Sequence, residues 1–174
     1  MDAATLAKRI PGISHSGFYV EDLDRTIDFY TKVLGAKLEW RRDNVKNPLI
    51  KMYVGDFGLS IITRPPEQQR VEIPHAIHFA YRVDHETAED TIEYIKSCGV
   101  EVEGPIGNPA QNCIVSWFFV DPDEHRLELE ATYPTTEMRA GVIKRGEQAG
   151  QRKDLGLHGG DAFCNRVALE RFFF

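Results

Sequence analysis

Hydrophobic and polar positions follow two different periods along this chain, and the same order of periods occurs twice. An apolar, β-rich stretch over 13–20 predicts a strand. Apolar residues then recur every three to four positions up to Leu34, which predicts an amphipathic helix, and Gly35 is a typical residue to end it. Three more strands are predicted at 36–42, 50–54 and 59–63. The polar, proline-containing segment 64–70 cannot be a central strand and is expected to be a linker.

The pattern begins again after this linker. The second set is a strand at 76–83 and a helix at 87–98 ending at Gly99. A further strand begins at 100–103, and two more strands span 114–120 and 126–132. His15 and His78 hold matching places near the start of the first strand of each set. An internal repeat of this kind dictates the fold. We expect an α+β protein in which two βαβββ modules form one curved mixed sheet, with the helices outside and a metal-binding cup inside.

The repeat also sets the expected domain boundaries. Residues 1–132 form the paired domain, with module one at about 12–64 and module two at about 75–132, and residues 133–174 form a C-terminal extension. A short helix is expected at about 137–145, capped by Thr135 or Thr136. The chain ends in three phenylalanines, which we expect to dock on the domain or on a second subunit, because an exposed cluster of this kind favours aggregation.

Composition narrows the class of protein. The 174 residues suffice for one domain, and the net charge of -6 without long charged runs argues against nucleic acid or an anionic membrane as partner. No apolar run reaches the roughly 18 residues of a membrane span, and the first residues contain no signal-peptide core. Three cysteines without paired spacing fit free thiols in a reducing compartment. The cytoplasm is therefore the expected location.

Strand alternation brings three metal-ligating residues to one face of the expected sheet. His15 shares a face with Gly17 and Tyr19, and His78 shares a face with Ala80 and Arg82. On the last strand the leucines face the core, so Glu128 faces the cup. Two imidazoles and one carboxylate on rigid strands make a facial ligand set that leaves positions open for substrate and O₂ or water.

Two phrases carry a family resemblance. The segment from His15 to Gly35, HSGFYVEDLDRTIDFYTKVLG, resembles the opening module of the vicinal oxygen chelate superfamily. The segments His78 to Asp84 (HFAYRVD) and Asp121 to Leu129 (DPDEHRLEL) resemble its second module. The superfamily includes glyoxalase I, fosfomycin-resistance proteins, methylmalonyl-CoA epimerase and extradiol dioxygenases. The resemblance covers about residues 12–132 and implies paired βαβββ modules around a metal.

The resemblance places His15, His78 and Glu128 at the family's ligand positions. A fourth ligand position, used by glyoxalase I and the epimerase, is occupied by Ser60, which favours a three-ligand site. Gly17 stands where the fosfomycin enzymes have threonine, which argues against that branch.

The dioxygenase-like members resemble the closing segment 116–133, although their usual catalytic tyrosine is replaced by Phe118. Their supporting histidine is not found, since Asn108 or Asn112 stands near its place, so no catalytic residue is assigned. Tyr19, Arg82 and Phe118 are expected to face the cup and bind substrate.

The first functional hypothesis is an extradiol-type ring-cleaving dioxygenase with Fe(II), acting on a small substrate such as an aromatic diol, with a homodimer implied by the family. One alternative is a redox-neutral glyoxalase-like lyase, isomerase or thiol transferase that uses Mn, Ni or Zn as a Lewis acid. The other is a metal-free protein that binds a small ligand in the cup.

The remaining histidines are given plainer roles. His125 is expected to be a surface turn residue, and His75 and His85 are expected to be solvated. His158 lies in the glycine-rich tail, where it is a candidate for a lid over the cup.

Overall fold

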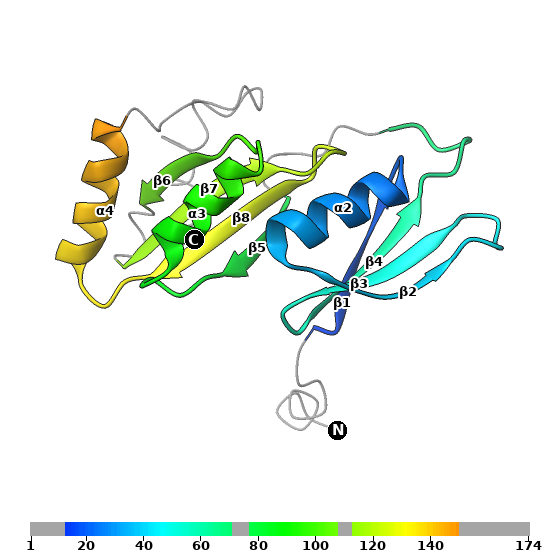
Figure 1. Ribbon diagram of the computed structural model, residues 1–174, viewed down its shortest axis with the longest axis horizontal. Coiled ribbons are helices and arrows are strands. Elements are labelled where there is room, and N and C mark those ends of the chain that lie inside the picture. Colours follow the sequence, from blue (N-terminus) through cyan, green and yellow to red (C-terminus); the bar gives the residue numbers. More distant parts are fainter. Residues whose placement is uncertain (1–12, 71–76, 108–112, 150–174) are drawn as a thin grey trace, which may run out of the picture. The chain divides into compact units, whose positions relative to one another are not determined.

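The computed structural model describes residues 13–70, 77–107 and 113–149, and the chain divides into two compact units between Gln69 and Arg70 (Figure 1). The first unit contains one helix and four strands: β1 (His15–Val20), α2 (Leu23–Leu34), β2 (Lys37–Arg42), β3 (Leu49–Val54) and β4 (Phe57–Thr63). The second unit repeats this order and adds a helix: β5 (His78–Arg82), α3 (Ala88–Ser97), β6 (Glu103–Gly107), β7 (Ile114–Val120), β8 (Arg126–Thr132) and α4 (Thr136–Gln148). The predicted repeat of strand, helix and three strands is confirmed.

Both sheets have the same topology. Their strand orders are β1-β4-β3-β2 and β5-β8-β7-β6, and in each the first strand runs parallel to the last. The α+β class and the two βαβββ modules are confirmed. The expected single curved sheet is instead two four-stranded sheets, because the first strand of each module hydrogen-bonds to the last strand of its own module.

The local sequence explains the helix of module one. The Asp22 side chain accepts a hydrogen bond from the backbone N–H of Arg25 at 3.0 Å, which caps α2 and lowers the pKa of the Asp22 carboxyl. Gly35 ends the helix with φ of 63°, a left-handed conformation that costs glycine little. The helix then packs on one face of its sheet, where Phe18 lies 6.1 Å from Tyr30 between ring centroids.

Each sheet therefore has one face covered by its helix and one that is not. In module one the covered face includes Leu59, Ile61, Ile50 and Met52, all fully buried. In module two Leu127 and Leu129 are buried as predicted, and Trp117 shares a hollow with residues of α3. We call the opposite face of each sheet its open face, since this is where the predicted site residues lie.

The strand predicted to begin at 100–103 instead starts at Glu103 and runs through Pro105. Proline is tolerated here because β6 is the edge of its sheet, and the register shifts between Glu103 and Ile106. No helix within the described ranges is long and apolar enough to cross a membrane.

Helix α4 packs against β6 in the second unit (Figure 1). Thr135 is its cap, accepting a hydrogen bond from the backbone N–H of Met138 at 3.2 Å, so the helix is longer than predicted and Thr136 is its first residue. Gly146 lies so close to the Pro105 ring that a Cβ there would be 2.1 Å from it. Residues 150–174, which hold most of the glycine-rich tail and the triple phenylalanine, lie outside the described residues.

Candidate metal centre

The strand registers of the two modules match residue for residue around the predicted ligands. In module one His15 pairs with Gly58 and Gly17 with Ser60. In module two His78 pairs with Arg126 and Ala80 with Glu128. Since the topologies are the same, His15 corresponds to His78 and Ser60 corresponds to Glu128. The repeat thus puts Ser60 where the second module carries its carboxylate.

His78 and Glu128 meet on the open face of module two. Nε2 of His78 lies 2.8 Å from Oε2 of Glu128, although the two residues are 50 positions apart in the chain. The Glu128 side chain is only 8% exposed, whereas the imidazole is about one third exposed. A buried carboxylate needs a proton or a cation to balance its charge.

The geometry of this pair fits two ligands of one metal ion. Two ligand atoms bound about 2.1 Å from an ion at a right angle are about 3 Å apart. The observed 2.8 Å between Nε2 and Oε2 is close to that spacing. Both donors also lie on neighbouring strands of one sheet, which holds them more firmly than a loop would.

Side chains around this pair limit its chemistry. The Phe118 ring stands edge-on to the His78 ring with 6.0 Å between centroids. Cζ of Arg126 lies 4.2 Å from the centre of the Phe118 ring, and its guanidinium is 3.8 Å from the Glu103 carboxylate. Phe118 therefore contacts the predicted site but brings no hydroxyl to it.

The third predicted ligand belongs to module one. His15 is exposed on the open face of that module, and its Nδ1 lies 2.8 Å from the hydroxyl of Ser14. Within neither unit, taken over its described residues, do three His, Cys, Asp or Glu side chains gather closely enough to hold an ion. The ligand set of His15, His78 and Glu128 stays a prediction.

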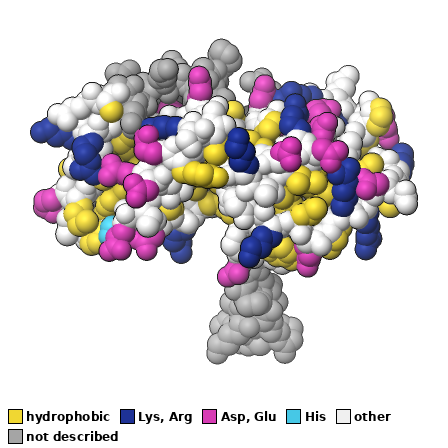
Figure 2. Space-filling model, viewed as in Figure 1, with side chains coloured by type: hydrophobic (Ala, Val, Ile, Leu, Met, Phe, Trp, Pro, Cys, Tyr) yellow, Lys and Arg dark blue, Asp and Glu magenta, His cyan; other side chains and the backbone are white. Residues whose placement is uncertain are grey.

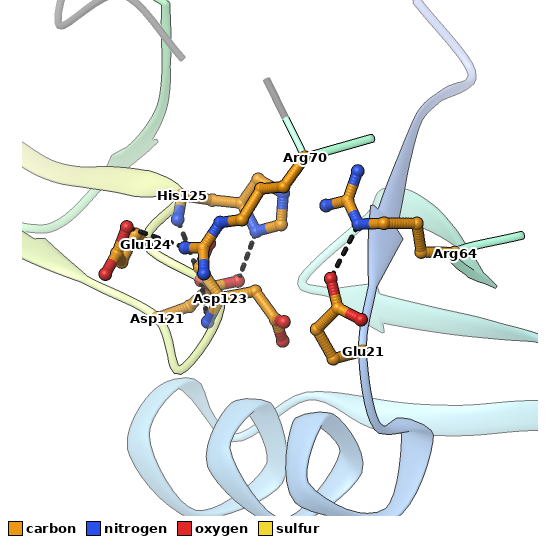
Figure 3. Close-up of polar contacts among 7 residues, drawn as sticks. All are labelled: Glu21, Arg64, Arg70, Asp121, Asp123, Glu124 and His125. Carbon is orange, nitrogen blue, oxygen red and sulfur yellow. Dashed lines mark hydrogen bonds and ion pairs between the residues drawn. The ribbon is translucent and has the colours of Figure 1, made fainter. Parts of the chain in front are cut away.

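The predicted substrate-binding residues lie on the open faces of their own modules. Tyr19 is half-buried, with Cζ of Arg64 6.0 Å from its ring centre. Arg64 itself binds Glu21, with Nε 2.6 Å from the carboxylate (Figure 3). Arg82 is exposed and faces Glu130 in register, yet among the described residues it forms no ion pair with that carboxylate.

The turn before β8 overturns the prediction for His125. This residue is 5% exposed, and its Nδ1 lies 2.8 Å from Oδ2 of Asp121 (Figure 3). Oδ1 of Asp121 accepts the backbone N–H groups of Asp123 and His125, each at 2.9 Å. Arg70 closes the turn from outside by donating to the Asp123 carbonyl and the Glu124 carboxylate. His125 is thus a buried structural residue, and not a surface one.

This turn was missed because histidine is common in exposed turns. The signal was the spacing of Asp121 and His125, four residues apart, which lets one carboxylate bind both the ring and the backbone of the turn. Tyr81 lies nearby, and burial, together with the negative charge of Asp121, raises the pKa of its phenol. The Tyr81 hydroxyl is buried without a hydrogen-bond partner among the described residues.

Several other candidates remain untested. Asn108, Asn112, His75 and His158 lie outside the described residues. His85 is partly exposed, as predicted, with Nδ1 3.3 Å from the Asp84 carboxylate.

On the face shown in Figure 2, acidic and basic side chains are interspersed, in line with the charge pattern of the sequence.

Comparisons with known proteins agree on one superfamily. The model of the Glyoxalase/Bleomycin resistance protein/Dioxygenase superfamily matches residues 12–129. The lactoylglutathione lyase of Escherichia coli O157:H7 is 32% identical over 121 residues, which are 66% of this chain and 88% of that protein. A probable chloroplastic lactoylglutathione lyase of Arabidopsis thaliana is 31% identical over 137 residues, but the match spans 75% of this chain and only 39% of that protein.

Solved structures point the same way. The fosfomycin resistance protein FosX of Listeria monocytogenes superposes with a TM-score of 0.58 at 26% identity, over 75% of this chain and 97% of that one. A variant of the same protein has been solved with Mn(II) and 1S,2S-dihydroxypropylphosphonic acid, and it has a TM-score of 0.57 at 23% identity. The presence of FosX among the similar proteins weakens the argument from Gly17 against the fosfomycin branch.

Proposed function

We propose that this chain, which belongs to the Glyoxalase/Bleomycin resistance protein/Dioxygenase superfamily, is a divalent-metal enzyme that performs redox-neutral chemistry on a small substrate with two neighbouring oxygens. The ion would be held by His15, His78 and Glu128. The observation that carries the proposal is the 2.8 Å contact between His78 and the buried carboxylate of Glu128. When bound, a divalent ion supplies a Lewis acid that polarises substrate oxygens.

The residues of the chain have separate tasks in this proposal. Glu128 offers a buried carboxylate, and Nε2 of His78, 2.8 Å from Oε2, would be the neighbouring ligand of a bound ion. Phe118 excludes water from one side of the imidazole, and Arg126 brings a cation to the same face of module two. Glu103, 3.8 Å away, offsets part of this positive charge, and the remainder favours a substrate that carries an anionic group.

A redox-neutral reaction is preferred to the Fe(II) dioxygenase predicted from the sequence. The similar proteins described above are lactoylglutathione lyases and FosX, and FosX has been solved with Mn(II) and a vicinal diol phosphonate. Phe118 cannot donate or accept a proton beside His78. For this chain we therefore favour Mn(II) or another divalent ion that acts as a Lewis acid over Fe(II), and an aliphatic oxygenated anion over an aromatic diol.

The test compares both reaction types on one preparation. Full-length protein purified without oxygen is loaded with Mn(II), and in parallel with Fe(II), and given S-lactoylglutathione, fosfomycin or a panel of catechols. Turnover of one of the first two with Mn(II), abolished in Glu128→Gln and kept in the matched surface variant Glu93→Gln, supports the proposal. Oxygen uptake with a catechol that requires Fe(II) would contradict it and favour the dioxygenase.

The homodimer and the cytoplasmic location remain predictions. Light scattering after size-exclusion chromatography should give twice the mass of one chain, and a monomeric mass would contradict the expected dimer.

A further inference from the structure

Lys51 is a largely buried lysine on the open face of module one. The residue is 9% exposed and lies in the centre of β3. Among the residues that the structure describes, no carboxylate pairs with its ammonium and no acceptor hydrogen-bonds to it. Nζ lies over the Tyr53 ring, 5.5 Å from the ring centroid. Nζ is not among the fully buried side-chain atoms that lack a partner, so the stem of the side chain is buried while the ammonium reaches solvent.

The register places this lysine beside the predicted ligand of module one. Lys51 pairs with Ser60 across β3 and β4, and Ser60 pairs with Gly17 across β4 and β1. These residues therefore share the face that also carries His15.

The lysine side chain leans toward the row of His15. A Cβ built on Gly58 would lie 2.7 Å from Nζ of Lys51, so the ammonium occupies the space above this glycine. Gly58 is the register partner of His15. A side chain at position 58 would displace the ammonium. Because glycine has none, Nζ of Lys51 can lie close to the row of His15.

The internal repeat identifies the residue of module two that corresponds to Lys51. Ser60 corresponds to Glu128, and the partner of Glu128 on β7 is Phe118. Lys51 is therefore the counterpart in module one of Phe118 in module two. The position that lacks a polar group in the second module carries a cation in the first.

We infer that Lys51 binds an anionic group of the substrate, a carboxylate or a phosphonate, on the open face of module one. An ammonium that has no carboxylate partner among the described residues is available to bind such a group through short, charge-assisted hydrogen bonds. The inference rests on the proposed function for the statement that this anion belongs to the substrate of the metal site. It deepens that proposal by naming the residue that selects an anionic substrate.

The test measures anion binding and metal binding separately. Inorganic phosphate and methylphosphonate are titrated by calorimetry into the full-length protein, once with Mn(II) and once after removal of metal with a chelator. Lys51→Met should bind both anions at least about tenfold more weakly than the wild type while keeping the Mn(II) affinity within twofold. The matched control is Lys37→Met, which removes an exposed lysine from β2 of the same sheet and should change neither affinity.

Stability provides a second readout. Because Lys51→Met keeps the buried stem and removes an ammonium that has no carboxylate partner among the described residues, its melting temperature should equal or exceed that of the wild type. A fall in melting temperature with unchanged anion affinity would mean a structural role and would overturn the inference. Equal weakening in Lys37→Met, or no anion binding by the wild type, would overturn it as well. Failure of the proposed function looks different: the wild type would bind no metal, while anion binding by the metal-free protein would still depend on Lys51.

Discussion

The turn that leads into β8 should be among the parts of module two most sensitive to mutation. Its centre is the Asp121 carboxylate, which is fully buried and takes part in three hydrogen bonds, two with backbone N–H groups and one with the His125 ring. Asp121→Ala would leave these donors buried without their acceptor. Each orphaned buried donor costs about 1–3 kcal/mol.

We therefore expect Asp121→Ala to lower the free energy of unfolding of this module by roughly 3–5 kcal/mol, since the individual terms overlap and do not add fully. Asp121→Asn keeps one carbonyl oxygen toward the two backbone donors and should lose about 1–3 kcal/mol. Asp28→Ala, on the exposed side of α2, is the matched control and should stay within about 0.5 kcal/mol of the wild type.

The two tryptophans make the assay specific to one module. Trp117 is 2% exposed in β7, and Trp40 lies in β2 of the other unit. In a Trp40→Phe background, urea unfolding followed by fluorescence reports on module two alone. If Asp121→Ala costs no more than Asp28→Ala there, the carboxylate does not organise the turn and the argument from buried hydrogen bonds is refuted.

Three further perturbations follow from the packing of module two. Tyr81→Phe removes a buried hydroxyl that lacks a partner among the described residues, so it should keep or raise stability at pH 7. Above a pH of about 10 the wild type should lose stability, because the raised pKa keeps the Tyr81 phenol neutral in the folded state while it ionises in the unfolded state. Denaturant unfolding at pH 8 and 11 should therefore show a smaller loss of stability in the variant. Gly146→Val should detach α4 from Pro105 and be detected as a lower melting temperature, whereas Gly141→Ala on the same helix, where a Cβ meets nothing closer than 3.4 Å, should be mild; equal effects would contradict this packing. Thr135→Ala should cost about 1 kcal/mol by loss of the helix cap, measured by urea unfolding, with Thr135→Ser close to the wild type, and a neutral alanine variant would contradict the capping.

The sequence predicts the modules well because each is determined by local signals. Periodicity locates α2 and its final turn, and alternation places Leu127 and Leu129 in the core with Glu128 on the opposite face. The internal repeat then implies that both modules have one topology, which the two strand orders confirm. His78 and Glu128 could be paired from the sequence for the same reason.

Features that depend on contacts distant in the chain or on edges were harder to predict. The shift of β6 to Glu103–Gly107 depends on its place at the sheet edge, where Pro105 is tolerated. The burial of His125 depends on a carboxylate folding back onto its own turn. Lys51 was overlooked because a lysine in a strand is normally exposed, and only the register shows it above Gly58.

The proposed function requires His15, His78 and Glu128 to hold one ion. Mn(II) binding to the full-length protein, measured by calorimetry with metal analysis of the dialysed product, tests this claim most directly. His15→Ala, His78→Ala and Glu128→Ala should each weaken binding by about 100-fold or more, because losing a ligand costs more than the 10- to 100-fold loss typical of its supporting residues. His85→Ala should bind one equivalent like the wild type. A His15→Ala variant that keeps the affinity of the wild type would contradict this requirement.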